Sequence, residues 1–231
     1  MLSARKLVHL LVAATALAIA APAFAADNVL RVYIARHGIT DWNVALRVQG
    51  NTDNSLNETG RKQAAALVER MRGVQLDHIY TAALVRTRQT AEGFTGVKQT
   101  AIPGLNERSH GKFEGIVDDP KNNAEMSAEY RRRIRIVDDS LDGGESLGDQ
   151  WKRVGAATRD ILSRHKNGGN ILIVGHGGSN PQIMAELLGL KPDEALNRVR
   201  QANDEVYMVE LRPGRPPMIW KNITMATLEE L

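Results

Sequence analysis

The chain contains no cysteine, and this absence removes two kinds of protein from consideration. Without thiols there is no disulfide framework, and a lipid anchor on an N-terminal cysteine is excluded as well. The fold must therefore be stabilised by an ordinary packed core. The 231 residues are enough for one domain with a core of substantial size.

A strong excess of charge of either sign is also missing. The sequence has 30 lysines and arginines against 27 aspartates and glutamates, and two of the basic residues, Arg5 and Lys6, lie in the N-terminal segment. A nucleic-acid-binding domain is typically strongly basic and carries recognisable readout motifs, and neither is found here. We therefore expect no nucleic-acid partner, and a preference for anions must come from a local group of residues.

Long hydrophobic runs are scarce, and the one that stands out lies at the N-terminus. Residues 7–21 are mainly apolar, follow two basic residues and precede the small-x-small sequence Ala-Phe-Ala at 23–25. This order is typical of a secretory signal peptide, and the run is shorter than the ~18 residues of a membrane-spanning helix. The sequence predicts that residues 1–25 are cleaved and that residues 26–231 form one periplasmic or secreted domain without stable membrane insertion.

Strand and helix patterns alternate along the rest of the chain. Short runs predict strands at residues 29–35, 76–80, 98–102, 170–174, 205–211 and 218–223. Apolar residues at helical spacing predict helices at residues 59–73, with Thr59 as N-cap, and at 84–94, 145–166 and 182–188. In the helix at 145–166, the predicted apolar side carries Leu147, Trp151, Val154, Thr158, Ile161 and Leu162. The alternation predicts an α/β fold, a three-layer sandwich with a mostly parallel central sheet flanked by helices. Residues 109–144 are polar and broken, and we expect them to be an excursion near the active site.

Two of the predicted strands end in a histidine that is followed by glycine. The first strand leads to Arg36 and His37, and the strand at 170–174 leads to His176. Because the carboxyl ends of parallel strands meet at one edge of a sheet, we expect the two imidazoles to lie together. Arg36 and Arg86, which also follow strands, would add forked donors suited to the charge of a phosphoryl group. These residues predict a binding site for a phosphate dianion.

Other kinds of site fit the sequence less well. A metal site on His37 and His176 lacks a further ligand at metal-binding spacing, and two arginines would repel the cation. The segment Gly178-Ser179-Asn180 lacks the second glycine of a serine nucleophile elbow, and no Walker phosphate loop is present. The sequence therefore predicts a site without a metal or cofactor.

Five blocks of residues, in the right order, resemble the signatures of the histidine phosphatase superfamily, also called phosphoglycerate-mutase-like. They are Arg36-His37-Gly38 with Thr40, Trp42 and Asn43; Arg47-Val48-Gln49-Gly50 with Leu56 and residues 59–64; Ile79-Tyr80 with residues 84–91; Leu105-Asn106-Glu107 with Gly111 and residues 113–115; and Val174-Gly175-His176-Gly177. The resemblance covers most of residues 26–231.

The resemblance implies a metal-independent enzyme of the phosphatase branch, which hydrolyses a small phosphorylated substrate through a phosphohistidine. In that mechanism His37 would attack phosphorus, and Glu107 would protonate the leaving oxygen and then activate water. The catalytic residues that it implies are Arg36, His37, Arg86, Glu107 and His176. The substrate-binding residues that it implies are Thr40, Asn43 and Gly177. The oligomeric state stays open.

Two alternatives to a phosphatase also stay open. If residues 130–135 are helical, Arg131 and Arg135 share a face and could hold a substrate for return of its phosphoryl group, as in a phosphoglycerate mutase. Against this, residues 143–146 resemble the phosphatase branch. Ile39 stands where the family usually has a carboxamide or carboxylate, and this leaves room for a catalytically weak protein that binds phosphate ligands.

Overall fold

The central sheet combines a parallel part with an antiparallel edge. The computed structural model describes residues 28–222 and 224–225, so the predicted signal peptide lies outside the described residues. Within them, the strand order is β3-β2-β4-β1-β5-β6-β7. Parallel pairing joins β1 (Leu30–Arg36), β2 (His78–Thr81), β3 (Gln99–Ala101) and β4 (Gly169–Gly175). Antiparallel pairing adds β5 (Val206–Leu211), β6 (Met218–Lys221) and β7 (Thr224–Met225).

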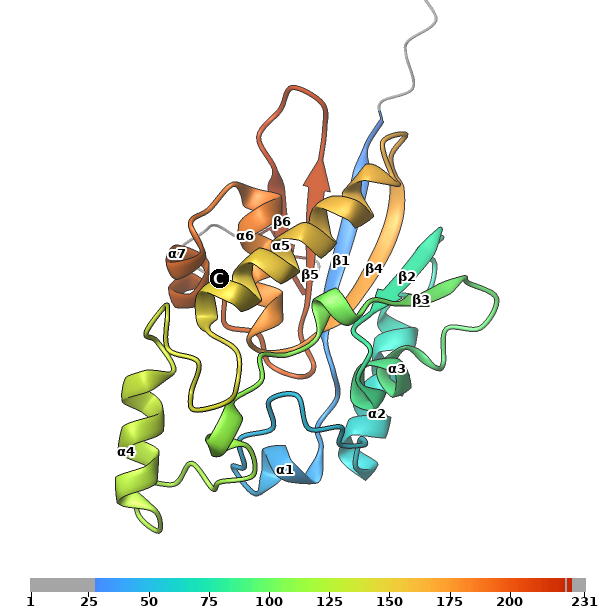
Figure 1. Cartoon of the computed structure of the whole chain (residues 1–231). Coiled ribbons are helices and arrows are strands. Elements are labelled where there is room, and N and C mark those ends of the chain that lie inside the picture. The colour runs from blue at the N-terminus through green and yellow to red at the C-terminus, as the bar shows by residue number, and fades with distance from the viewer. Residues whose placement is uncertain (1–27, 223, 226–231) are drawn as a thin grey trace, which may run out of the picture.

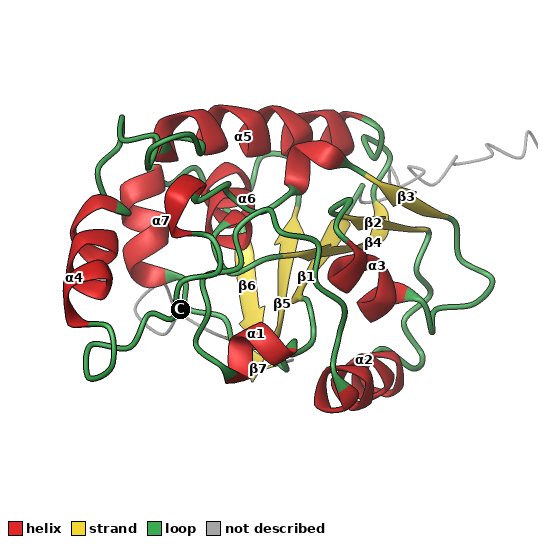
Figure 2. Ribbon diagram, turned by 60° about the horizontal axis from the view of Figure 1, so that its bottom comes forward, coloured by secondary structure: helices red, strands yellow, loops and turns green. Residues whose placement is uncertain are grey.

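Helices cover both faces of this sheet (Figure 1, Figure 2). On one face, α5 (Leu147–Ser163) and α6 (Ser179–Leu188) bury Val154, Ile161 and Ile183 against the strands, and α7 (Pro192–Arg198) packs beside α6. On the other face, α2 (Glu58–Arg70) and α3 (Val85–Ala91) bury Leu67 and Ala91. The predicted three-layer α/β sandwich is therefore confirmed. Among the described residues, no helix has both the length and the apolar character to cross a membrane.

The N-cap of α2 lies two residues before the position that the sequence favoured. Its N-cap is Asn57, whose Oδ1 accepts a hydrogen bond from the Gly60 N–H at 2.9 Å. The prediction of Thr59 as N-cap was wrong. Both residue types can cap a helix, and the asparagine two residues earlier satisfies the amide that a cap must serve.

The buried face of α5 differs from the prediction at one of the expected residues, Trp151. The period of apolar residues placed Trp151 on the buried side, but its exposed fraction is 37%. The buried residues include Val154, Thr158 and Ile161, as predicted, and also Gln150, which the prediction left out. Gln150 was missed because it is polar and the period was built mainly on apolar residues.

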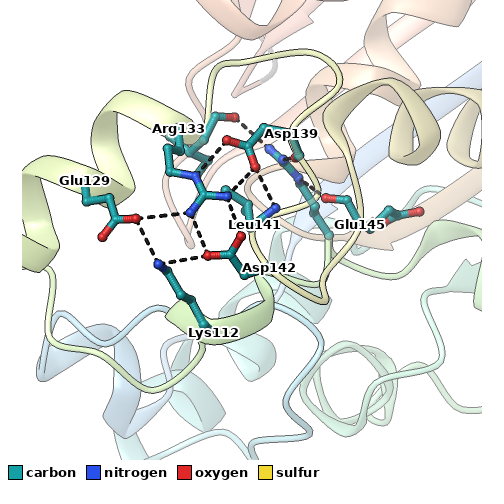
Figure 3. Close-up of polar contacts among 9 residues, drawn as sticks. Lys112, Glu129, Arg133, Asp139, Leu141, Asp142 and Glu145 are labelled. Carbon is teal, nitrogen blue, oxygen red and sulfur yellow. Dashed lines mark hydrogen bonds and ion pairs between the residues drawn. The ribbon is translucent and has the colours of Figure 1, made fainter.

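Residues 109–144 form their own small unit at the end of the molecule where α1 (Asp41–Val44) also lies (Figure 1). They contain the short turn η2 (Gly111–Phe113) and the helix α4 (Ala124–Arg133), and Phe113, Tyr130 and Leu141 build a satellite core with Val48. Figure 3 shows an ionic network within this unit, in which Arg133 at the end of α4 binds Asp139 and Asp142 of the following loop. Much of this segment is thus held by its own contacts.

Candidate active site

The two histidines lie side by side where neighbouring parallel strands end. Arg36 at the end of β1 pairs with Gly175 at the end of β4, and the His37 N–H donates to the Gly175 carbonyl at 3.0 Å. The ring centroids of His37 and His176 are 5.2 Å apart. Both side chains are buried, with exposed fractions of 3% and 0%. The strand pairing itself therefore brings the two imidazoles to the same edge of the sheet.

The hydrogen bond of His37 fixes which ring nitrogen carries the proton. Its Nδ1 lies 2.8 Å from the Gly38 carbonyl oxygen. A carbonyl can only accept, so Nδ1 carries the hydrogen and Nε2 keeps its lone pair. Burial, reinforced by the charges of Arg86 and Arg36, lowers the pKa of His37 well below 6.5. The imidazole is therefore neutral at neutral pH and offers a nucleophilic nitrogen.

His176 has an environment that suits an anion. Burial lowers its pKa well below 6.5, and the charges of Arg86 and nearby groups act in the same direction. Neither of its ring nitrogens has a hydrogen-bond partner among the described residues. A bound anion would supply a partner and would favour the protonated ring, because opposite charge stabilises the imidazolium. His176 can thus become a cationic donor when a phosphoryl group is present.

Two arginine side chains are anchored beside these rings by backbone carbonyls. Arg86 in the first turn of α3 is fully buried, and its two Nη atoms donate to Thr52 O at 2.7 Å and Gly50 O at 2.8 Å. Arg36 Nη1 donates to Gln201 O at 3.0 Å. The Nε atoms of both arginines are buried without a hydrogen-bond partner among the described residues. Both guanidinium groups are therefore fixed in place and still keep a donor for an anion.

The two glycines after His176 make room for the charged groups. A Cβ on Gly177 would lie 3.1 Å from Arg36 Cζ, so a larger residue would press on the guanidinium. The Gly178 N–H donates to Glu107 Oε2 at 2.8 Å. A side chain at Gly178 would collide with the same carboxylate. The turn after β4 can therefore approach both charged groups closely only because these residues are glycines.

Glu107 reaches this turn from the β3 edge of the sheet. It follows the turn η1 (Pro103–Leu105), which comes after the edge strand β3. Its Oε1 accepts hydrogen bonds from the Arg108 N–H at 3.0 Å and from Gln150 Nε2 at 3.1 Å. Arg36 and Arg86 lie within the electrostatic reach of the carboxylate. A carboxyl group is thus held at the turn that follows His176 and within electrostatic reach of both arginines.

A cavity of about 610 Å³ begins at Arg36 and Glu107 and extends away from the sheet. Its further lining comes from residues 109–144, from α5 and from α7. Four of the lining residues, Arg108, His110, Tyr130 and Gln150, were not predicted to be functional from the sequence. Only Gln150 carried a recognisable signal, because it is a polar residue on the apolar face of a helix.

Thr40 and Asn43 are engaged with each other at the start of α1. The Asn43 N–H donates to Thr40 Oγ1 at 3.2 Å, and the Thr40 N–H donates to Asn43 Oδ1 at 3.0 Å, which forms a capping box. The Thr40 hydroxyl also lies 2.9 Å from Gln49 Oε1. A contact from Asn43 to a phosphoryl group would therefore have to come from its Nδ2.

The loop that carries His37 is held through its backbone. The Gly38 N–H donates to Thr90 Oγ1 at 3.0 Å, and the Ile39 N–H donates to Gln63 Oε1 at 2.8 Å. The Ile39 carbonyl accepts from the Asn57 N–H at 3.0 Å. These contacts do not use the side chain of Ile39, so an apolar residue at this position leaves the loop anchored.

Arg131 and Arg135 do not share a helical face, because residues 130–135 are not all helical. The helix α4 ends at Arg133, and the chain turns after its C-cap Ile134. Arg131 Nε donates to Asp118 Oδ1 at 2.9 Å, whereas Arg135 lines the cavity and its Nη1 donates to Asn197 Oδ1 at 3.2 Å. Only Arg135 is therefore placed to meet a ligand in this cavity.

Comparison with known proteins agrees with the fold described above and with the resemblance that the sequence motifs indicated. A model described as histidine phosphatase superfamily (branch 1) matches residues 32–224. Two proteins named probable phosphoglycerate mutase GpmB, from Photorhabdus laumondii and Citrobacter koseri, are 32% and 34% identical to this chain; each match covers 78% of the chain and 85% of that protein.

The chain is also similar to solved structures. Bacillus stearothermophilus YhfR superposes with a TM-score of 0.71 and 27% identity, over 87% of this chain and 100% of that one. The mycobacterial glucosyl-3-phosphoglycerate phosphatase superposes with a TM-score of 0.69 and 25% identity, over 79% of this chain and 90% of that one. The relatives therefore include proteins named as mutases and proteins named as phosphatases.

Proposed function

The chain belongs to the histidine phosphatase superfamily, and on that premise we propose that it is an exported, metal-independent phosphomonoesterase. The observation that carries the proposal is the state of His37. Its Nδ1 is bound to a carbonyl, its Nε2 keeps the lone pair, and buried arginines stand beside it. The predicted signal peptide supports export, and phosphatases among the structural relatives support hydrolysis.

In the first half of the reaction, the Nε2 lone pair of His37 attacks phosphorus. The bond between phosphorus and the ester oxygen breaks, and its electron pair leaves with that oxygen, which takes the proton of the Glu107 carboxyl group. Arg36, Arg86 and His176 stabilise the charge on the remaining phosphoryl oxygens, which is the main demand of this transition state. The products are a free alcohol and a phosphohistidine.

In the second half, water replaces the histidine. The Glu107 carboxylate accepts a proton from water as the water oxygen attacks phosphorus. The bond between phosphorus and Nε2 breaks, and its electron pair returns to the ring as the lone pair. Inorganic phosphate leaves, and both His37 and Glu107 regain their starting protonation states.

The proposal is tested with purified protein comprising residues 26–231. We expect release of phosphate from 4-nitrophenyl phosphate in the presence of a metal chelator, and a labelled phosphohistidine when a substrate with a labelled phosphate group is trapped without acid. The variant His37→Ala should lose both. Phosphate release by this variant at the rate of the parent protein would refute the assignment.

A second candidate function is phosphoryl transfer of the phosphoglycerate mutase kind. It is favoured by the names of the curated relatives and by the position of Arg135, which could hold a second anionic group of a substrate in the cavity. With phosphoglycerate as substrate, a mutase interconverts the isomers faster than it releases phosphate. A phosphatase does the reverse, and a protein that only binds phosphate ligands forms no phosphohistidine.

A further inference from the structure

One carboxamide lies on the buried face of α5, where the helical period otherwise places small or apolar groups. Gln150 has an exposed fraction of 1%, and the residues that continue its line along the helix are Val154, Thr158 and Ile161. A buried carboxamide is unfavourable unless it forms hydrogen bonds. Gln150 Nε2 donates to Glu107 Oε1 at 3.1 Å, so the burial of this polar group is linked to the carboxylate of the active site.

The hydrogen bonds to Glu107 come from three separate parts of the chain. Those from Arg108 and Gly178 are main-chain N–H groups, and the one from Gln150 is the only side-chain donor to Glu107 in the hydrogen bonds of the described residues. The main-chain donors hold one oxygen each. Gln150 adds a second donor to Oε1, so this oxygen accepts two hydrogen bonds and Oε2 accepts one. The orientation of the carboxylate is thereby fixed.

The orientation of the carboxylate matters because two cations attract it electrostatically. Arg36 and Arg86 both lie within electrostatic reach of Glu107, and Gln150 borders the cavity together with Arg36 and Glu107. Without the donor from α5, the carboxylate is freer to rotate about its last bond toward a guanidinium group. In that orientation it would neutralise a group needed for the phosphoryl oxygens and would turn away from the leaving oxygen.

We propose that Gln150 is a positioning residue, which holds the carboxyl group of Glu107 in the orientation that transfers a proton to the leaving oxygen. The inference rests on the proposed phosphatase function. It predicts an effect that depends on the leaving group. An alcohol of high basicity needs the proton as the ester bond breaks, whereas 4-nitrophenolate leaves readily without it.

The test compares two esters of similar size, benzyl phosphate and 4-nitrophenyl phosphate. The quantity to measure is kcat/KM, because it reports the steps up to formation of the phosphohistidine. For Gln150→Met, which keeps the side-chain length, we expect kcat/KM to fall about 10-fold for benzyl phosphate and by less than about 2-fold for 4-nitrophenyl phosphate. The matched control is Thr158→Val on the same helix face, which should change neither value.

Two further variants show whether Gln150 acts through Glu107. Gln150→Glu preserves the shape of the side chain but replaces the donor by an acceptor, so it should lose benzyl phosphate activity at least as strongly. The double variant Glu107→Gln with Gln150→Met should be no slower on benzyl phosphate than Glu107→Gln alone, since a positioning residue has nothing left to position.

The outcomes separate this inference from the proposed function. Equal losses on both esters, no loss on benzyl phosphate, or additive losses in the double variant would overturn the role of Gln150. The phosphatase assignment depends on a different result, the loss of activity in His37→Ala. It can therefore stand when the role of Gln150 falls.

Discussion

The site has two ends that are built in different ways. At the phosphate end, His37, His176, Arg36 and Arg86 follow directly from strand ends or from the first helical turn after a strand, and backbone carbonyls hold the side chains of His37, Arg36 and Arg86. At the leaving-group end, the cavity is lined by side chains from residues 109–144, α5 and α7. The first end depends on sheet pairing, and the second depends on how separate segments pack. Substrate preference can therefore change at one end while the chemistry of the other end is preserved.

The largest expected effect comes from the phosphate end. In Arg86→Ala the site loses a buried cation whose N–H groups are already oriented, and such donors are worth about 10²–10³-fold in rate in sites that exclude water. We expect kcat/KM to fall by about 10³-fold for 4-nitrophenyl phosphate and benzyl phosphate alike. The matched control is Arg88→Ala, which removes an exposed arginine from the same helix. If Arg86→Ala lowered kcat/KM much more for one ester than for the other, the phosphate end and the leaving-group end would not act independently.

The difference between the ends also decides what the sequence could predict. The positions of His37 and His176 followed from two apolar strands and the rule that parallel strands end at one edge. Arg108 had no such signal. It is buried because its guanidinium donates to the carbonyls of Ile134, Asp139 and Glu145, and these contacts exist only after residues 109–144 have folded back. Local patterns cannot reveal a contact between distant backbone atoms.

Errors in the sequence predictions have the same origin. Trp151 was assigned to the buried face of its helix because it is apolar, whereas the buried residue is Gln150, whose partner Glu107 lies elsewhere in the chain. Arg131 and Arg135 would share a face only if residues 130–135 were helical, and the helix ends between them. In both cases the observed partner is remote in sequence, Glu107 for Gln150 and Asn197 for Arg135, and has no signal in the local period.

An intermediate effect concerns the dependence of stability on pH. Burial lowers the pKa of His37 and His176 below 6.5, so in the folded protein these rings stay neutral where the unfolded chain takes up protons. Below pH 6.5 the unfolded state therefore binds more protons, and the free energy of unfolding falls as the pH is lowered toward the folded pKa values. Each such group contributes a slope of up to about 1.4 kcal/mol per pH unit.

Chemical unfolding between pH 7 and pH 5 measures this slope. In His176→Asn we expect a shallower fall in the free energy of unfolding, since one neutral buried imidazole is gone. Arg135→Ala at the leaving-group end should keep the slope of the parent protein. An unchanged slope in His176→Asn would contradict a contribution of the His176 imidazole to the pH dependence.

The smallest expected effect tests the leaving-group end alone. Arg135 is exposed at the cavity, and its guanidinium has a hydrogen bond to Asn197 at 3.2 Å. An exposed ion pair is worth up to about 1 kcal/mol, so Arg135→Ala should raise KM by no more than about 5-fold for 3-phosphoglycerate, which carries a second anionic group. For benzyl phosphate, which lacks that group, KM should stay the same.

The matched control for this prediction is Arg131→Ala. Arg131 is bound to Asp118 and does not line the cavity, so its removal should leave KM for both substrates unchanged although the net charge changes equally. A rise in KM in both Arg135→Ala and Arg131→Ala would show a long-range effect of charge, which 0.5 M salt would suppress. A rise in KM confined to Arg135→Ala and to 3-phosphoglycerate would show that the cavity recognises the second anionic group of the substrate through Arg135.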